Sequence, residues 1–145
     1  MTRKEIDVAG VDFIQSVGLL VRKARALVST EELSWTEAAV LKRLSVDGPA
    51  TTAELARASG MKPQSMRSIV GELEKLGMVK RRPHATDGRQ VNLELTAKGA
   101  AAQKVARDAK QTWFAEAIAK LPGKERETLF AAGEIIRNLI KEERL

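Results

Sequence analysis

Apolar residues recur every three or four positions near both ends of the chain, which is the spacing of one face of an α-helix. The pattern predicts a long amphipathic helix over residues 7–28 and two more over 97–121 and 124–142, divided by Pro122 and Gly123. The helix over 97–121 would be about 38 Å long, too long for one small lobe. The first helix has its apolar stripe at Val11, Ile14, Val17, Leu20, Val21, Ala24, Leu27 and Val28.

The middle of the chain carries the start and stop signals of three shorter helices. Two S/T-x-x-E sequences, at 34–37 and 51–54, have the spacing of a capping box. Glycine and proline at 48–49 end the first helix, and Gly60 ends the second. A third helix follows over 63–76, and the glycine-containing turn before it makes the pair a helix-turn-helix. Its apolar stripe is Met66, Ile69, Val70, Leu73 and Leu76.

The segment after this helix pair has the pattern of a β-hairpin. Residues 79–82 are short, extended and basic, and residues 91–95 alternate apolar and polar side chains, which is the period of a half-buried strand. Asp87 and Gly88 lie between them and favour a tight turn. The hairpin would form a wing beside the helix pair.

These elements together predict a mainly α fold with a small β-hairpin wing. We expect a winged helix-turn-helix lobe over residues 34–96, and a helical dimerisation lobe built from the N- and C-terminal helices, residues 1–33 and 97–145. The stripe over 7–28 is more than a small lobe can cover, so part of it should meet another helix or another chain. The alternative is that this helix packs only on its own domain.

Charge is concentrated around the hairpin. The formal net charge is +6 and the pI is about 9.8, which favours a polyanionic partner, either nucleic acid or an anionic membrane. Residues 62–98 hold eight basic and four acidic side chains, so the basic excess is greatest there. The position of the charge therefore favours a partner that meets the second helix of the pair and the wing.

The composition excludes several kinds of site. Without cysteine, the chain can form no disulfide, sense no oxidant through a thiol and offer no thiolate to zinc. We expect no metal site and no cofactor. The first dozen residues include acids and lack a continuous apolar core, and no later segment reaches the roughly 18 apolar residues of a membrane span. We therefore expect a cytoplasmic protein without a membrane partner.

The N-terminal end of the helix over 63–76 carries the candidate base-reading residues. An α-helix fits the major groove of DNA, where glutamine can pair with adenine and arginine with guanine. The alternative is that these are ordinary solvated side chains. The candidates are Lys62, Gln64, Ser65, Arg67 and Ser68.

The hairpin supplies a second set of candidate DNA contacts. Arg89 is placed to enter the minor groove, and Asp87 could hold its guanidinium in a bidentate pair. A surface ion pair without a role in binding is the alternative. Lys80, Arg81 and Arg82 should contact phosphates, which positions a protein on DNA without reading its sequence. The wing candidates are Lys80, Arg81, Arg82, Asp87, Gly88 and Arg89.

Four segments stand in an order and at a spacing typical of a known family: LSWTEAAVLKRL, TTAELARASGM, LEKLGMVKR and ATDGRQVNLELTAKG. Over nearly its whole length the chain resembles the multiple antibiotic resistance regulator (MarR) family of bacterial winged-helix transcription factors, most sharply at Asp87, Arg89, Leu95, Thr96 and Gly99. The resemblance implies a homodimer, joined through its terminal helices, that binds a pseudo-palindromic operator in double-stranded DNA. It also implies repression that a small aromatic or phenolic effector relieves.

Departures from the family pattern narrow the sensing chemistry. Members that sense peroxide use a cysteine, which this chain lacks, and its one histidine does not suit a zinc site. His84 lies in the hairpin, where it would gain charge near phosphate below roughly pH 6.5, or else is a solvated turn residue. The family's pocket location suggests Phe13, Val17 and Trp35 as the lining of an effector crevice between the lobes. Core packing is the alternative for these side chains.

The leading hypothesis is a dimeric, sequence-specific DNA-binding regulator, most simply a repressor that an effector releases. The alternative is an effector-independent architectural protein whose winged helix binds DNA or RNA. An enzyme is disfavoured because the chain has no thiol nucleophile, one histidine and no Gly-rich phosphate loop. We therefore assign no catalytic residue.

Overall fold

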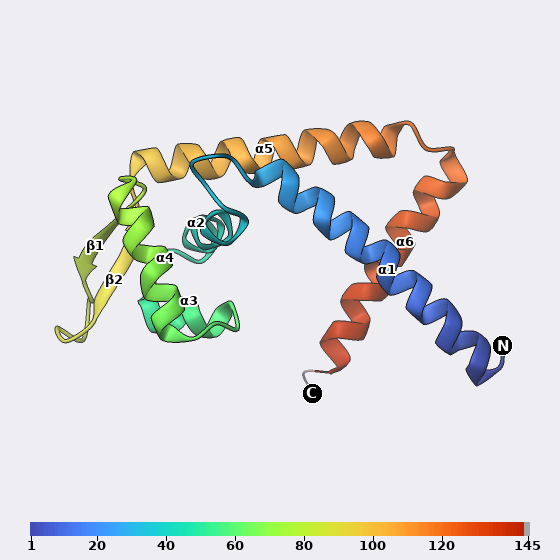
Figure 1. Cartoon of the computed structure of the whole chain (residues 1–145), viewed down its shortest axis with the longest axis horizontal. Helices are drawn as coiled ribbons and strands as arrows, with labels where there is room; N and C mark the ends of the chain where they lie inside the picture. Colours follow the sequence, from blue (N-terminus) through green and yellow to red (C-terminus); the bar gives the residue numbers. More distant parts are fainter. Residues whose placement is uncertain (144–145) are drawn as a thin grey trace. The chain divides into compact units, whose positions relative to one another are not determined.

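The computed structural model describes residues 1–143 and is mainly helical, with one antiparallel β-hairpin (Figure 1). This confirms the fold class predicted from the sequence. The chain divides into two compact units, Met1–Lys110 and Gln111–Leu145. The elements are α1 (Arg3–Val28), α2 (Trp35–Asp47), α3 (Thr52–Ala58), α4 (Pro63–Lys75), β1 (Val79–Pro83), β2 (Val91–Leu95), α5 (Ala97–Ala119) and α6 (Gly123–Glu142).

Helix α1 begins at Arg3, earlier than the expected start at residue 7. The hydroxyl of Thr2 accepts a hydrogen bond from the Glu5 backbone N–H at 3.2 Å, and the Glu5 carboxylate accepts one from the Thr2 backbone N–H at 2.6 Å. These two bonds form a capping box, which satisfies helix N–H groups that otherwise have no partner. The apolar stripe starts only later, so hydrophobic spacing alone placed the helix start too far along the chain.

The helix starts of the winged-helix region follow their sequence signals closely. At α2, Ser34 Oγ accepts from the Glu37 N–H at 3.2 Å, and the Glu37 carboxylate accepts from the Ser34 N–H at 3.3 Å, which confirms the predicted capping box. At α3, the hydroxyl of Thr51 accepts from the backbone N–H of Glu54 at 3.1 Å. Thr51 is thus the N-cap of α3, through the forward bond of the predicted box.

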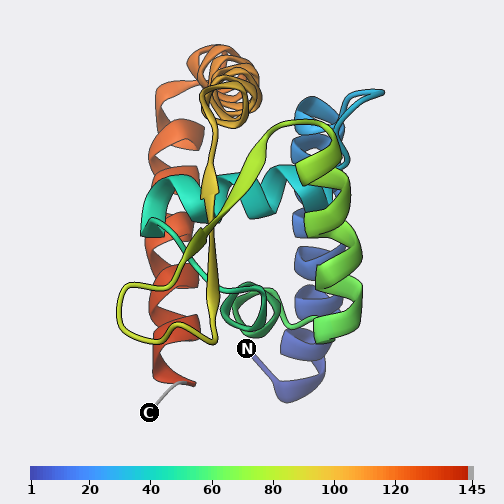
Figure 2. The same cartoon turned by 90° about the vertical axis from the view of Figure 1, so that its left-hand side faces the viewer.

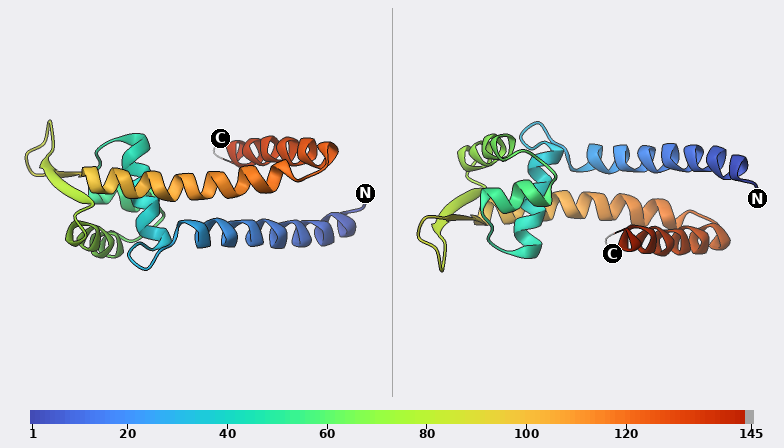
Figure 3. Two further views of the ribbon diagram at one scale, coloured as in Figure 1. Left: turned by 90° about the horizontal axis from the view of Figure 1, so that it is seen from above. Right: turned by 90° about the horizontal axis from the view of Figure 1, so that it is seen from below.

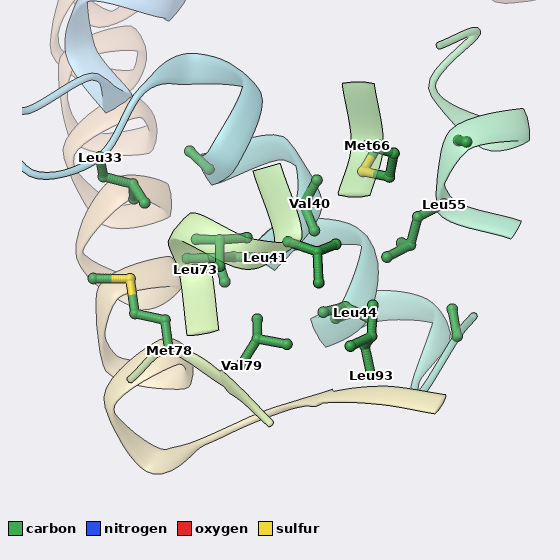
Figure 4. Close-up of a cluster of buried hydrophobic side chains, with 14 of the residues drawn as sticks. Leu33, Val40, Leu41, Leu44, Leu55, Met66, Leu73, Met78, Val79 and Leu93 are labelled. Atoms are coloured by element: carbon green, nitrogen blue, oxygen red, sulfur yellow. The ribbon is translucent and has the colours of Figure 1, made fainter. Parts of the chain in front are cut away.

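One apolar core holds α2, α3, α4 and the hairpin together (Figure 4). Leu41, Leu55 and Leu73 are completely buried, as is Met66. Burying a side chain of this size stabilises the fold by about 1.5–3 kcal/mol. The predicted stripe of α4 is the face that points into this core. The side chains labelled in Figure 4 are Leu33, Val40, Leu41, Leu44, Leu55, Met66, Leu73, Met78, Val79 and Leu93.

The hairpin lies beside α4 and is fastened to the core at its base (Figure 2). Its register pairs Val79 with Leu95 and continues to Pro83 opposite Val91. The backbone of Leu93 also exchanges two hydrogen bonds with Ala50, at 2.8 and 3.1 Å. The segment between α2 and α3 therefore acts as a short third partner of the sheet and holds β2 against the core.

Gly99 explains why α5 can start directly against the base of the hairpin. A Cβ at this position would overlap the carbonyl oxygen of Met78, so only glycine permits the observed approach. The Thr96 hydroxyl donates to the Gly77 carbonyl at 2.5 Å and accepts from the Gly99 N–H at 3.1 Å. The Leu-Thr-x-x-Gly motif is thus the junction between the wing and α5.

The terminal helices α1 and α6 leave most of their apolar side chains exposed. Helix α1 runs outward from the short helices α2, α3 and α4 (Figure 3), and Val28 at its end is the one buried residue of this helix. On α6, Ile135 is 59% exposed and Leu139 is 57% exposed. Within its own compact unit α1 is buried only at Val28, and what covers the rest of its apolar stripe stays a prediction. Across residues 1–143, no helix has both the length and the apolar character needed to span a membrane.

Candidate nucleic-acid interface

The N-terminal end of α4 presents an exposed polar surface without acidic residues. Lys62 is the N-cap and makes no side-chain capping bond, and Pro63 follows as the first helical residue. No acidic side chain lies in the first turn, so the positive end of the helix dipole is not neutralised locally. The five predicted residues of this region are all exposed: Lys62, Gln64, Ser65, Arg67 and Ser68.

The wing cations Lys80, Arg81 and Arg82 are exposed, but each forms an ion pair with a carboxylate of the chain. Arg81 pairs with Glu74 of α4 at 2.8 Å, Arg82 pairs with Glu94 of β2 at 2.8 Å, and Lys80 also pairs with Glu94, at 3.3 Å. The hydrogen bond from Arg82 holds the pKa of the Glu94 carboxyl below its ordinary value. The Glu74 carboxylate raises the pKa of the Arg81 guanidinium, chiefly through its hydrogen bond.

Glu74 and Glu94 are functional candidates that reasoning from the sequence missed. A signal for Glu94 was present, because a hairpin centred on Asp87 places residue 94 opposite Lys80, as the structure shows. Cross-strand neighbours of opposite charge commonly pair. No comparable signal exists for Glu74, since its pairing depends on the angle between α4 and the wing.

Asp87 and Arg89 interact differently from the prediction. The carboxylate of Asp87 accepts a hydrogen bond from the Arg89 backbone N–H at 3.0 Å, and the expected pair between carboxylate and guanidinium is not formed. A carboxylate in a tight turn readily reaches the main-chain N–H two residues later, which explains the difference. Within residues 1–143 the Arg89 guanidinium has no ion-pair partner, and the residue is exposed. Gly88 lies between them and is exposed as well.

His84 organises the turn at the tip of the wing. Its ring Nδ1 accepts hydrogen bonds from the backbone N–H groups of Asp87, at 3.1 Å, and Thr86, at 3.3 Å. Accepting at Nδ1 places the proton of the neutral ring on Nε2. The residue is half-buried and hydrogen-bonded, so His84 is not a freely solvated turn residue, and its role near phosphate stays a prediction.

Within one chain, the predicted effector residues Phe13 and Val17 lie one turn apart on α1, whereas Trp35 lies near Arg25 toward the other end of that helix. Trp35 packs against the core, with the Arg25 guanidinium 5.6 Å from its ring centroid. Phe13 is 46% exposed and lies twelve residues before Arg25 on α1, which is about 18 Å along the helix axis. Val17 is half-buried between these positions. An effector site at these residues therefore stays a prediction.

Metal sites and small-molecule pockets are the other kinds of site to consider. No group of three or more metal-binding side chains occurs in residues 1–143. In the unit Gln111–Leu145 there is a shallow hollow between α5 and α6, and none of the three predicted effector residues lines it. It is lined by Ala115, Ile118, Ala119, Arg126 and Phe130.

Comparison with known proteins identifies the family. The MarR family model matches residues 32–90, the segment that contains every predicted DNA contact. An uncharacterized HTH-type transcriptional regulator from Mycobacterium bovis is 34% identical over 131 residues, which cover 90% of this chain and 92% of that protein. An HTH-type transcriptional repressor from Mycobacterium tuberculosis is 33% identical over 106 residues, covering 72% of this chain and 76% of that protein.

A solved structure shows the same fold. The structure of an S. aureus MepR mutant bound to an oligodeoxyribonucleotide matches with a TM-score of 0.67 and 17% identity, covering 90% of this chain and 97% of that one. Together with the sequence relatives, this likeness confirms the resemblance noted in the sequence. The chain belongs to the MarR family, whose members are DNA-binding transcriptional regulators and not enzymes.

Proposed function

We propose that this protein is a homodimeric repressor that reads a pseudo-palindromic operator in double-stranded DNA and is released by a small effector. The observation that carries the proposal is the exposed, acid-free N-terminal end of α4 beside a basic wing. The similarity to a mycobacterial HTH-type transcriptional repressor supports negative regulation. A repressor acts where the DNA lies, so the proposal includes a cytoplasmic location.

In this proposal α4 is the recognition helix and enters the major groove. Gln64 and Arg67 have side chains that can form bidentate hydrogen bonds with base edges, whereas Ser65 and Ser68 can donate to bases or phosphates. Lys62, at the positive end of the helix, suits a phosphate. Arg89, whose guanidinium has no ion-pair partner in residues 1–143, enters the minor groove next to the recognition helix.

Pairing of two chains follows from the exposed apolar side chains of the terminal helices. Val11 and Ile14 of α1 are 61% and 66% exposed, and Phe130 of α6 is 57% exposed. Apolar area of this extent is normally covered by a partner. We propose that residues 1–33 and 97–145 supply the dimer contacts, and that residues 34–96 read one half-site each. Two-fold pairing suits half-sites about one helical turn of DNA apart.

The effector part of the proposal concerns Phe13, Val17 and Trp35. Aromatic side chains suit an aromatic ligand, and the Arg25 cation beside Trp35 suits an acidic group on that ligand. A ligand can weaken DNA binding only by the difference between its affinities for the DNA-competent and DNA-incompetent conformations. We therefore propose an aromatic acid or phenol that binds better to the conformation unable to span two half-sites.

The DNA-reading assignment is tested with a duplex that the wild-type chain selects from a random-sequence pool, and with a mixed-sequence duplex of equal length. Arg89→Ala should weaken binding and reduce the salt slope by about one. Gln64→Ala should reduce the preference for the selected duplex by about 1–3 kcal/mol. Lys120→Ala removes a cation outside residues 32–90 and is the charge control. Wild-type affinity and slope in Arg89→Ala would show that the wing assignment is wrong.

The effector assignment is tested by a thermal-shift screen of aromatic acids and phenols. A compound that raises the melting temperature should also release the selected duplex, and Trp35→Ala should weaken both effects. If every stabilising compound leaves DNA binding unchanged, effector release is excluded for that chemical class.

A further inference from the structure

We infer that Arg81 is a positioning residue: its ion pair with Glu74 ties the recognition helix to the wing and sets how both meet one DNA duplex. The sequence had suggested that Arg81 contacts phosphate. The inference rests on the proposed function, because it requires α4 and the wing to touch the same duplex. It deepens that proposal by separating cations that touch DNA from one that aligns the reading elements.

The geometry of this pair is specific. Arg81 Nη2 lies 2.8 Å from Glu74 Oε1, and Arg81 Nε lies 3.0 Å from Oε1 and 3.1 Å from Oε2. Two adjacent guanidinium nitrogens therefore engage one carboxylate, which fixes direction as well as distance. Glu74 is in the last turn of α4 and Arg81 is in the middle of β1, so this arrangement constrains the angle between helix and strand.

Strand alternation explains why Arg81, and not its neighbours, reaches α4. Arg81 pairs with Leu93 across the hairpin, and Leu93 is 1% exposed in the core. Residues directly opposite in an antiparallel pair share one face, so Arg81 leaves the hairpin on the face that borders the lobe. Lys80 and Arg82 alternate to the other face, where both meet Glu94.

The tie lies on the part of β1 that has left the core, since Val79 is buried and the four residues after it are exposed. The turn between α4 and β1 passes through Gly77, whose φ is 72°, and is held by a hydrogen bond from the Met78 N–H to the Leu73 carbonyl at 3.0 Å. Beyond that point the strand leaves the helix. Within residues 1–143, the Arg81–Glu74 pair is the side-chain hydrogen-bonded link between α4 and either strand. Breaking it should let the wing swing relative to the recognition helix.

Glu94 provides a matched control for Glu74. It also holds wing cations, Arg82 at 2.8 Å and Lys80 at 3.3 Å, but both partners lie in the same hairpin. The strand register already fixes the geometry of that hairpin. Replacing either glutamate by glutamine removes one negative charge that would repel phosphate, so a pure charge effect raises DNA affinity in both variants. Only loss of alignment predicts that Glu74→Gln lowers DNA affinity while Glu94→Gln does not.

The test compares Glu74→Gln and Glu94→Gln on the selected duplex and on the mixed-sequence duplex. Glu74→Gln should weaken binding to the selected duplex by about three- to tenfold, because the wing must then be ordered during binding. Its binding to the mixed-sequence duplex should change less. Glu94→Gln should bind both duplexes at least as tightly as wild type. The melting temperature of both variants should stay close to that of wild type, since ion pairs that remain partly open to solvent contribute little to stability.

A charge swap separates alignment from phosphate contact. The double variant Glu74→Arg with Arg81→Glu should bind the selected duplex more tightly than Arg81→Glu with Glu94→Arg, which has the same net charge but does not rebuild the tie in reverse. A glutamate in place of a phosphate contact would not be rescued in this way. The inference is overturned if Glu74→Gln binds the selected duplex as tightly as wild type, or if the swap gives no recovery.

Arg89→Ala in the same assay distinguishes failure of this inference from failure of the proposed function. If Arg89→Ala weakens binding while Glu74→Gln does not, the wing reads DNA and only the positioning role is wrong. If neither variant weakens binding, the wing assignment itself fails and the inference fails with it.

Discussion

The winged-helix lobe and the terminal helices use similar amphipathic sequences in opposite ways. In the lobe, Leu41 and Leu73 are completely buried against other elements of the same chain. On α6, Ile135 and Leu139 have more than half of their surface exposed, although they follow the same helical spacing. Periodicity shows that a helix has an apolar face, but it does not show which molecule covers that face. The lobe buries its apolar faces within one chain, whereas the terminal helices leave theirs exposed.

The largest expected effect separates a buried leucine from an exposed one. Leu41→Ala should destabilise the chain by about 2–5 kcal/mol, because it removes transfer energy and leaves a cavity. Leu139→Ala should cost the lobe little and should instead raise the dimer dissociation constant. Denaturant unfolding and sedimentation measure the two effects. Equal loss of folding stability in both variants would contradict the division between the regions.

The next effect tests the junction of the wing with α5. Gly99→Ala should destabilise by about 1–3 kcal/mol, because its Cβ would overlap the Met78 carbonyl oxygen and force the backbone to move. Gly71→Ala in α4 is the control, since nothing lies within 4 Å of its added Cβ. The control should gain about 0.5–1 kcal/mol from the removal of a helical glycine. If the melting temperatures of both variants changed in the same direction, the close approach of Gly99 to Met78 would not be what limits stability at this junction.

A smaller effect compares two helix caps. Ser34→Ala removes the N-cap of α2, whose helix supplies core residues, and should cost about 1 kcal/mol of global stability. Thr2→Ala removes the corresponding cap of α1, whose first turns touch no core. Its effect should be confined to fraying of that end, visible as faster amide exchange near Glu5. A global loss in Thr2→Ala as large as in Ser34→Ala would mean that the start of α1 is part of the cooperative unit.

The smallest effect concerns two carboxyls, the exposed Glu5 and the half-buried Glu94. Glu5 and Glu94 both have a lowered pKa, the first because the Thr2 backbone donates a hydrogen bond and the second because Arg82 does. A lowered folded-state pKa contributes stability at neutral pH that is lost as pH falls below about 4.5 through the folded-state value. NMR titration should show both carboxyls titrating below that value. Protonation of Glu94 should loosen the hairpin, and protonation of Glu5 should loosen only the start of α1.

Much of the lobe could be predicted because local signals and burial agree there. The stripe of α4, the capping box at Ser34 and the turn at Asp87 each depend on residues a few positions apart. Long-range contacts could not be predicted in the same way. The overlap between Gly99 and Met78 and the pair between Arg81 and Glu74 depend on how elements meet in space.

Two local predictions needed correction, and each has a short-range cause. The start of α1 was placed late because the capping box at Thr2 precedes the apolar stripe. The expected contact of Asp87 with the Arg89 guanidinium gave way to the nearer backbone N–H. In both cases a hydrogen bond between a side chain and the main chain determined the local structure, and the pattern of side chains did not show it.

The central claim is that the lobe reads DNA while the terminal helices pair two chains. It is tested most directly by the double variant Ile135→Lys and Leu139→Lys, with Val46→Lys, an isolated exposed side chain of α2, as control. Sedimentation with the selected duplex should show two wild-type or control chains of 15.9 kDa on each duplex. The double variant should sediment alone as a single folded chain and bind that duplex weakly. A double variant that stays dimeric, or that binds the duplex as tightly as wild type in single copy, would contradict the account.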